Sequence, residues 1–207
     1  MNIKDIQNKG GAKKYFSIFG KSTVANQSRE YQFTEEVTKS LIENGFGVIH
    51  GGYAGGIMQA VADTAYKTIK ENSLPFERNI AVPQTQHDAT GWDRVENAFF
   101  MEPAKDIYSR LRDVSGHSDI VIVAPLGGDE TMLELNIVWH ENVLAKYTGD
   151  TVVPIIILQT ENGTDWKNIL ETLVAGLDNS TNSLDEIEWV YFASNINEFT
   201  DLVEKLN

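Results

Sequence analysis

The sequence of 207 residues contains no cysteine. This absence excludes a disulfide scaffold, a thiolate zinc site and a cysteine nucleophile. Basic residues are also scarce, because 17 Lys and Arg stand against 30 Asp and Glu and give a formal net charge of −13. Broad binding of DNA or RNA needs a basic footprint on the phosphates, so we expect no nucleic-acid partner. A small anionic ligand is compatible with this charge, because backbone amides and one arginine can hold a single phosphate.

Long apolar segments are missing as well. Residues 1–14 contain no apolar core of a signal peptide, and the longest apolar run, residues 152–158, is far shorter than a membrane span. We therefore expect a cytoplasmic protein with no membrane partner. The four histidines show no metal-ligand spacing, so we expect neither a metal site nor a cofactor.

Short apolar runs alternate with longer amphipathic segments along the chain. The runs expected to form strands are 15–19, 48–50, 79–82, 98–101, 120–124, 152–158 and 189–192. The segments expected to form helices are 31–44, 56–70, 104–115, 131–146, 165–175 and 197–206. This alternation predicts a single α/β domain over residues 1–207, with a doubly wound, mainly parallel sheet and helices on both faces. Residues 1–13 and 178–188 are expected to be flexible surface, because both stretches are polar.

Three of the expected strands end in unusual turns. Residues 50–58 read HGGYAGGIM and residues 124–131 read APLGGDET. One such turn alone could merely pack a helix on the sheet, whereas two favour a cleft lined with amide donors at the carboxyl ends of the strands. The Thr131 hydroxyl could cap the helix or hold a phosphate oxygen. The third turn reads GKST at 20–23 but is no P-loop, because Tyr15 stands where that motif needs glycine.

Two charged residues fall on apolar stripes of predicted helices. Glu134 shares a stripe with Leu135 and Val138, and Arg110 shares one with Leu111. A charge in such a place is costly unless it is paired, and an inward arginine offers a planar fork to a carboxylate or a phosphate. Both residues are therefore candidates for a functional site. The alternatives are a helix cap for Glu134 and a structural ion pair for Arg110.

Together these motifs resemble the LOG family, which includes the cytokinin-activating phosphoribohydrolases. The motifs that carry the resemblance are Gly-Gly-x-x-x-Gly-x-Met at 51–58, Arg-Leu at 110–111 ahead of Ser-Asp at 118–119, and Gly-Gly-x-x-Thr-x-x-Glu at 127–134. The resemblance extends over residues 19–158. The Glu-Leu-x-x-Val-Trp sequence at 134–139 is similar to a bacterial branch of the family.

The resemblance implies a Rossmann-like homodimer that hydrolyses the N-glycosidic bond of a nucleoside 5′-monophosphate to free base and ribose 5-phosphate, without a metal. Glu134 would stabilise an oxocarbenium-like transition state and orient water. Arg110 would neutralise the phosphate or assist departure of the base. The candidates for binding substrate or its phosphate are Ser22, Gly51, Gly52, Gly56, Met58, Gly127, Gly128 and Thr131.

Three residues depart from the family motifs. Leu126 separates Pro125 from the glycine pair, and both Glu130 and Tyr53 replace glycines. A carboxylate inside a phosphate-binding turn repels the ligand. The sequence therefore leaves two alternatives to a hydrolase: a non-catalytic nucleotide- or cofactor-binding module of the same fold, and a structural protein with a vestigial cleft.

Overall fold

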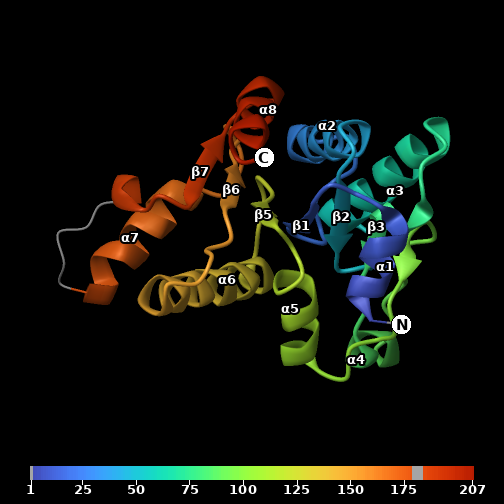
Figure 1. Ribbon diagram of the computed structural model, residues 1–207, viewed down its shortest axis with the longest axis horizontal. Helices are drawn as coiled ribbons and strands as arrows, with labels where there is room; N and C mark the ends of the chain where they lie inside the picture. The colour runs from blue at the N-terminus through green and yellow to red at the C-terminus, as the bar shows by residue number, and fades with distance from the viewer. Residues whose placement is uncertain (1, 179–183) are drawn as a thin grey trace.

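The computed structural model describes residues 2–178 and 184–207 and confirms the predicted α/β, Rossmann-like class (Figure 1). One sheet runs in the order β4-β3-β2-β1-β5-β6-β7, and all neighbouring strands are parallel. The strands are β1 Tyr15–Phe19, β2 Gly47–His50, β3 Asn79–Ala81, β4 Phe99–Phe100, β5 Ile120–Val123, β6 Ile155–Leu158 and β7 Val190–Ala193.

Helices cover both faces of this sheet. They are α1 Ile3–Gly10, α2 Arg29–Glu43, α3 Gly56–Glu71, α4 Thr85–Ala89, α5 Ile107–Ser115, α6 Asp129–Thr148, α7 Trp166–Asp178 and α8 Ile196–Lys205, with short 3-10 turns η1 Phe76–Arg78 and η2 Leu184–Glu186. One apolar cluster joins the strands to α2, α3 and α8, and a second joins them to α1, α5, α6 and α7. Figure 1 shows α2 and α8 on one side of the strands and α5 and α6 on the other.

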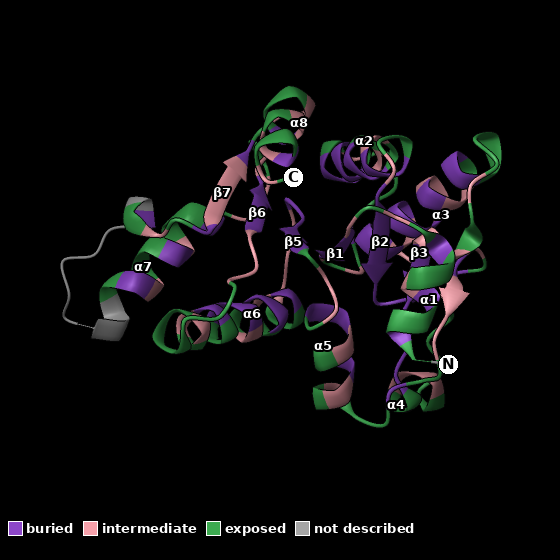
Figure 2. Cartoon of the chain, viewed as in Figure 1, coloured by how far each residue is buried: buried purple, intermediate pink, exposed green. Residues whose placement is uncertain are grey.

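The central strands are buried on both faces (Figure 2). Their sequences YFSIF, IVIV and IIIL are almost wholly apolar, as a parallel strand between two helical layers requires. The direction of winding reverses between β1 and β5, which pair along their length. Ligands of such sheets bind at this reversal, beyond the carboxyl ends of the strands. The turns after β1, β2 and β5 therefore meet at the edge where a site is expected.

The N-terminal segment differs from the prediction of flexible surface over residues 1–13. Helix α1 begins after Asn2, whose side chain accepts a hydrogen bond from the Asp5 backbone N–H at 2.9 Å. Ile3 and Ile6 are 2% and 1% exposed, and α1 packs against η1. Two isoleucines three residues apart bury one face of a short helix, although so few apolar residues give no visible periodicity in the sequence.

The other differences concern boundaries. Of the second stretch predicted to be flexible, 178–188, residues 179–183 lie outside the described residues, while Leu184–Glu186 forms η2. Helix α5 starts at Ile107 rather than at 104, because Asp106 accepts a hydrogen bond from the Ser109 backbone N–H and caps the helix. Helix α6 starts at Asp129, two residues before the predicted position. In the described part of the chain, no helix combines the length and apolar character needed to cross a bilayer.

Candidate functional site

The turn after β2 packs tightly against the backbone that follows β1. Gly52, Gly55 and Gly56 have φ angles of +83°, +95° and +51°, a region that favours glycine. A Cβ atom on Gly56 would lie 2.2 Å from the carbonyl oxygen of Lys21, and the Ile57 backbone N–H donates to that same oxygen at 3.1 Å. The N-terminus of α3 therefore lies directly beside Lys21 and Ser22.

The turn after β5 is built differently at its two glycines. A Cβ atom on Gly127 would lie 2.2 Å from the Trp166 ring, and the Gly127 N–H already donates to the Thr164 hydroxyl at 3.1 Å. Gly127 therefore serves packing and offers no free amide to a ligand. Gly128 faces open space and is the N-cap residue of α6, with no side-chain cap.

Thr131 does not cap α6, because the helix begins at Asp129 and Gly128 holds the N-cap position. The alternative role as a cap is therefore wrong. The Thr131 residue is 1% exposed. It lies in the first turn of the helix, one turn before Glu134, so the two side chains follow the same helix face.

Arg110 and Glu134 meet in the interior, as the apolar stripes predicted. Arg110 is 3% exposed and Glu134 is 8% exposed, with Nη1 of the arginine 3.7 Å from Oε1 of the carboxylate. The Arg110 Nε donates to the Val82 carbonyl oxygen at 3.2 Å. A Cβ atom on Gly51 would lie 2.2 Å from Arg110 Nη2 and 2.6 Å from the sulfur of Met58. Gly51 is therefore the residue that lets Arg110 and Met58 lie against the turn.

The surroundings of this pair shift the pKa of Glu134 in opposing directions. Burial raises the pKa of Glu134 to about 7, the nearby Arg110 opposes this rise, and Glu130 adds to it. Within the described residues, Nε is the sole guanidinium nitrogen of Arg110 that donates a hydrogen bond. The terminal nitrogens of Arg110 are thus available to an anion, and the Glu134 carboxyl can exchange a proton near neutral pH.

His50 has a structural role at the end of β2. Its Nδ1 accepts a hydrogen bond from the Gly52 N–H at 3.2 Å, and its Nε2 lies 3.1 Å from the Asn79 side-chain oxygen. Burial lowers the pKa of His50 to about 4, so the imidazole is neutral at physiological pH. This hydrogen-bonded histidine fixes the start of the glycine turn.

The structure also places an unpredicted segment beside the site. Helix α4 is the next helix after β3, and its residue His87 packs with Tyr53 and Trp92 at ring-centroid distances of 5.2 and 4.9 Å. The positive charge of Arg110 acts to lower the pKa of both His87 and Tyr53, so this aromatic group borders the buried pair. Sequence reasoning missed it because a five-residue helix has no readable periodicity.

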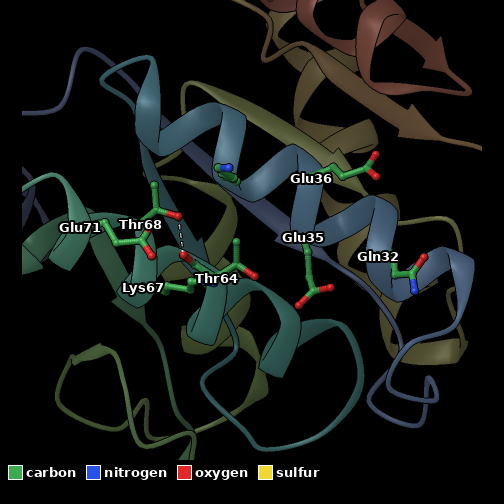
Figure 3. Close-up of a pocket in the computed structure, with 8 residues that line it drawn as sticks. Gln32, Glu35, Glu36, Thr64, Lys67, Thr68 and Glu71 are labelled. Carbon is green, nitrogen blue, oxygen red and sulfur yellow. Dashed lines mark hydrogen bonds between the residues drawn. The ribbon is translucent and has the colours of Figure 1, made fainter.

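A separate groove lies between α2 and α3 (Figure 3). Its volume is about 340 Å³, and its lining side chains are polar or charged on both helices, among them Glu35 of α2 and Lys67 of α3. No lining residue belongs to the glycine turns or to the pair of Arg110 and Glu134. This groove is therefore distinct from the candidate site. Among residues 2–178 and 184–207, no three His, Asp or Glu side chains gather as a metal site would require.

No protein-family model matches the chain, and no curated protein matches its sequence. Solved structures do match its fold. The molybdenum cofactor carrier protein of Chlamydomonas reinhardtii is 18% identical, with 94% of this chain and 98% of that chain covered and a TM-score of 0.56. The structural-genomics target TM1055 is 16% identical, with 93% and 99% covered and a TM-score of 0.59.

A third structure with this fold is the DNA processing protein A of Helicobacter pylori, described for its binding of single-stranded DNA. It is 19% identical, with 97% of this chain and 83% of that chain covered and a TM-score of 0.54. At such low identities these similarities establish the fold alone.

Proposed function

We propose that the chain binds a nucleoside 5′-monophosphate or a similar small phosphorylated ligand beside Arg110 and Glu134, and hydrolyses its N-glycosidic bond. The products would be the free base and ribose 5-phosphate. The observation that carries this proposal is the buried pair itself: a guanidinium with unbonded terminal nitrogens, 3.7 Å from a carboxyl whose pKa is raised to about 7.

Glu134 is the proposed catalytic group. Departure of the base leaves positive charge on the ribose, which an adjacent carboxylate stabilises. With a pKa of about 7, the carboxyl populates both protonation states at neutral pH. It can therefore orient and deprotonate the attacking water without being locked in either state.

Arg110 holds the ligand in this proposal. Its Nε is fixed on the Val82 carbonyl, and its planar group is pressed against Gly51, so the direction of the free nitrogens is set. Those nitrogens would bind a phosphate oxygen or polarise the leaving base.

The phosphate would lie at the start of α3, next to Ser22. The first turn of α3 contains no acidic residue and its N-cap Gly55 provides no side-chain cap, whereas the first turn of α6 contains Asp129 and Glu130. The Ile57 N–H of this turn is bonded to the Lys21 carbonyl oxygen, but a helix N-terminus without its own carboxylates is still the better anion site of the two. Ser22, Gly51, Gly52, Gly56 and Met58 would line this end of the cleft, with Gly128 and Thr131 opposite.

The test is a chromatographic screen for free base over a panel of purine and modified-purine nucleoside monophosphates. Release of base by the wild type, and its loss in a Glu134→Gln variant that still unfolds in one cooperative melting transition, are the expected results. Failure to release base from every nucleotide would refute the hydrolase.

A second candidate function is non-catalytic binding of a nucleotide or cofactor. Asp129 and Glu130 in the first turn of α6 favour it, because both weaken phosphate binding there. Structures of the same fold include a carrier of the molybdenum cofactor. Saturable binding by calorimetry together with no product in the screen would identify this function.

We further propose that two copies of the chain pair through α6, consistent with the homodimer implied by the LOG resemblance. Leu133, Ile137, Leu144 and Tyr147 follow one another along this helix at the spacing of a packing seam. Leu133, Leu144 and Tyr147 are 44%, 49% and 83% exposed. Such an interface would border the site, because Leu133 precedes Glu134.

A further inference from the structure

Two buried polar atoms beside the site lack a hydrogen-bond partner. They are the Oε1 atom of Gln84 and the Nδ1 atom of His87, and the described residues contain no others. Buried polar groups are bonded in the great majority of cases, since leaving one unpaired costs free energy. Two unpaired atoms three residues apart, in one segment next to Arg110, indicate that a partner from outside the chain belongs there.

The same segment carries flat aromatic surface. The His87 imidazole stacks on the Trp92 indole with ring centroids 4.9 Å apart and an interplanar angle of 12°. The Tyr53 ring meets both edge-on and is fully buried, whereas Trp92 is 40% exposed. Trp92 is therefore the outer member of the group, and it covers His87.

Hydrogen bonds attach this segment to the glycine turn on both sides of Trp92. After it, the Ala54 N–H donates to the Asp93 carbonyl at 2.8 Å. Before it, the Tyr53 hydroxyl accepts from the Gln84 N–H at 2.7 Å. Gly91 precedes Trp92 with a φ angle of +80°, and a Cβ atom there would contact nothing. The backbone of this stretch is held as well, because the Trp92 N–H donates to the His87 carbonyl oxygen at 3.3 Å and the Gly91 N–H donates to that of Asp88 at 3.2 Å. The freedom to open the group therefore lies in the partly exposed Trp92 side chain.

The electrostatic surroundings suit a neutral ring better than a phosphate. Burial and the charge of Arg110 lower the pKa of His87, while Glu130 and Asp88 oppose that change. The imidazole is therefore neutral at physiological pH and can accept or donate one hydrogen bond at Nδ1. The Asp88 carboxylate is already paired with Arg94, whose Nε donates to it at 3.0 Å.

We propose that Gln84, His87 and Trp92 form a subsite for a planar nitrogen heterocycle, the base of the ligand. The Trp92 indole rotates outward about its own side-chain bonds to admit the ring, which then stacks on the aromatic group. The ring edge exchanges hydrogen bonds with the Gln84 amide and with His87 Nδ1. This assignment rests on the proposed function for one point, the placement of the phosphate end at Arg110 and α3.

The test compares the affinities of AMP and ribose 5-phosphate by calorimetry, in a Glu134→Gln background so that AMP is not consumed. In that background AMP binds more tightly than ribose 5-phosphate. His87→Phe keeps the ring but removes its nitrogens, and Trp92→Ala removes the outer surface. Each raises the Kd for AMP by about tenfold and leaves the Kd for ribose 5-phosphate unchanged. The control Ala89→Ser changes an exposed residue of the same helix and alters neither affinity.

Equal affinities for AMP and ribose 5-phosphate, or an unchanged Kd for AMP in both variants, would overturn the subsite while leaving the phosphate site standing. Fluorescence tests the subsite separately from the proposed function. The fluorescence of Trp92 is the part of the emission that disappears in Trp92→Phe. Adenine alone quenches this part, even if ribose 5-phosphate does not bind and no nucleotide is hydrolysed. The subsite is also contradicted if adenine does not quench this emission and AMP binds no more tightly than ribose 5-phosphate.

Discussion

At the scale of single residues, the site depends on how Gly51, Arg110 and Glu134 fit together. Arg110 reaches Glu134 because Gly51 has no side chain, and the guanidinium lies where a Cβ atom would be. Burial then raises the pKa of Glu134 despite the neighbouring positive charge. A glycine, a cation and a carboxyl thus produce one group that titrates near neutrality.

The raised pKa of Glu134 predicts a pH-dependent change of stability. Between its ordinary pKa of 4.5 and about 7, the native state retains a proton that the unfolded state has lost. The protonated group therefore contributes its whole share of the free energy of unfolding below pH 4.5. As the pH rises from 4.5 to about 7, this contribution falls by about 1.4 kcal/mol per pH unit until it is lost. The variant Glu134→Gln lacks this loss, so its free energy of unfolding rises relative to that of the wild type over this range.

Denaturant titrations of both proteins at pH 4.5, 6 and 8 measure the difference in free energy of unfolding. Since all other titrating groups are shared, the difference isolates Glu134. A difference that stays constant with pH means that the Glu134 pKa is not raised.

Gly51→Ala is predicted to displace Arg110. The new methyl group would overlap both Arg110 Nη2 and the sulfur of Met58, so we expect a cost of about 1–3 kcal/mol in unfolding free energy and weaker binding of phosphorylated ligands. Gly128→Ala is the matched control for stability, because its φ angle is −129° and a Cβ atom there has no neighbour within 4 Å. Equal stability in the two variants, or wild-type ligand affinity in Gly51→Ala, would contradict this role of Gly51.

At the scale of elements, the first turns of α3 and α6 have opposite electrostatic character. Both helices start from glycine N-caps without a side-chain bond, yet only α6 has acidic residues in its first turn. Asp129 and Glu130 compensate the positive end of the α6 dipole. A phosphate that enters the cleft is therefore attracted more strongly to α3.

Glu130→Gln is predicted to tighten binding of AMP by about two- to fivefold, because it removes a partly screened negative charge at the start of α6, on the side of the site opposite α3. It should also lower the pKa of Glu134, which Glu130 raises. Calorimetry with AMP at low and high salt measures the gain, which shrinks as salt screens the charge. Glu141→Gln, an exposed position on the same helix, is the control. If Glu130→Gln binds AMP with the affinity of the wild type, the Glu130 carboxylate lies too far from the ligand to affect its binding.

The sequence revealed those parts of the site that lie on long periodic elements. Arg110 and Glu134 were recognisable because each interrupts an apolar stripe, and the glycine turns because they follow buried strands. Helix α1 was missed because two isoleucines bury its face without a repeating pattern. The group of Gln84, His87 and Trp92 was missed because tertiary packing alone brings it to the cleft.

At the scale of the whole molecule, the reversal of strand order at β1 and β5 brings three turns to one edge of the sheet. The turns after β1 and β2 hold the proposed phosphate end, and α5 and α6 supply the buried pair. The formal charge of −13 does not oppose this arrangement, because the ligand would be held by backbone amides and one arginine.

Pairing through α6 is predicted to be lost when a charge enters its exposed seam. Sedimentation velocity should give a dimer for the wild type and a monomer for Leu144→Glu, since a carboxylate cannot be buried there without a partner. The control Lys146→Ala changes a neighbouring exposed residue and should remain a dimer. A monomeric wild type would contradict the interface.

The most direct test of the central claim is detection of products from nucleoside 5′-monophosphates. Chromatography of the wild type with AMP, GMP and modified-purine nucleotides should show equal amounts of free base and ribose 5-phosphate, and Glu134→Gln should form neither while still binding the nucleotide. Base release that persists in Glu134→Gln, or no release from any nucleotide, would contradict hydrolysis at the Arg110 and Glu134 pair.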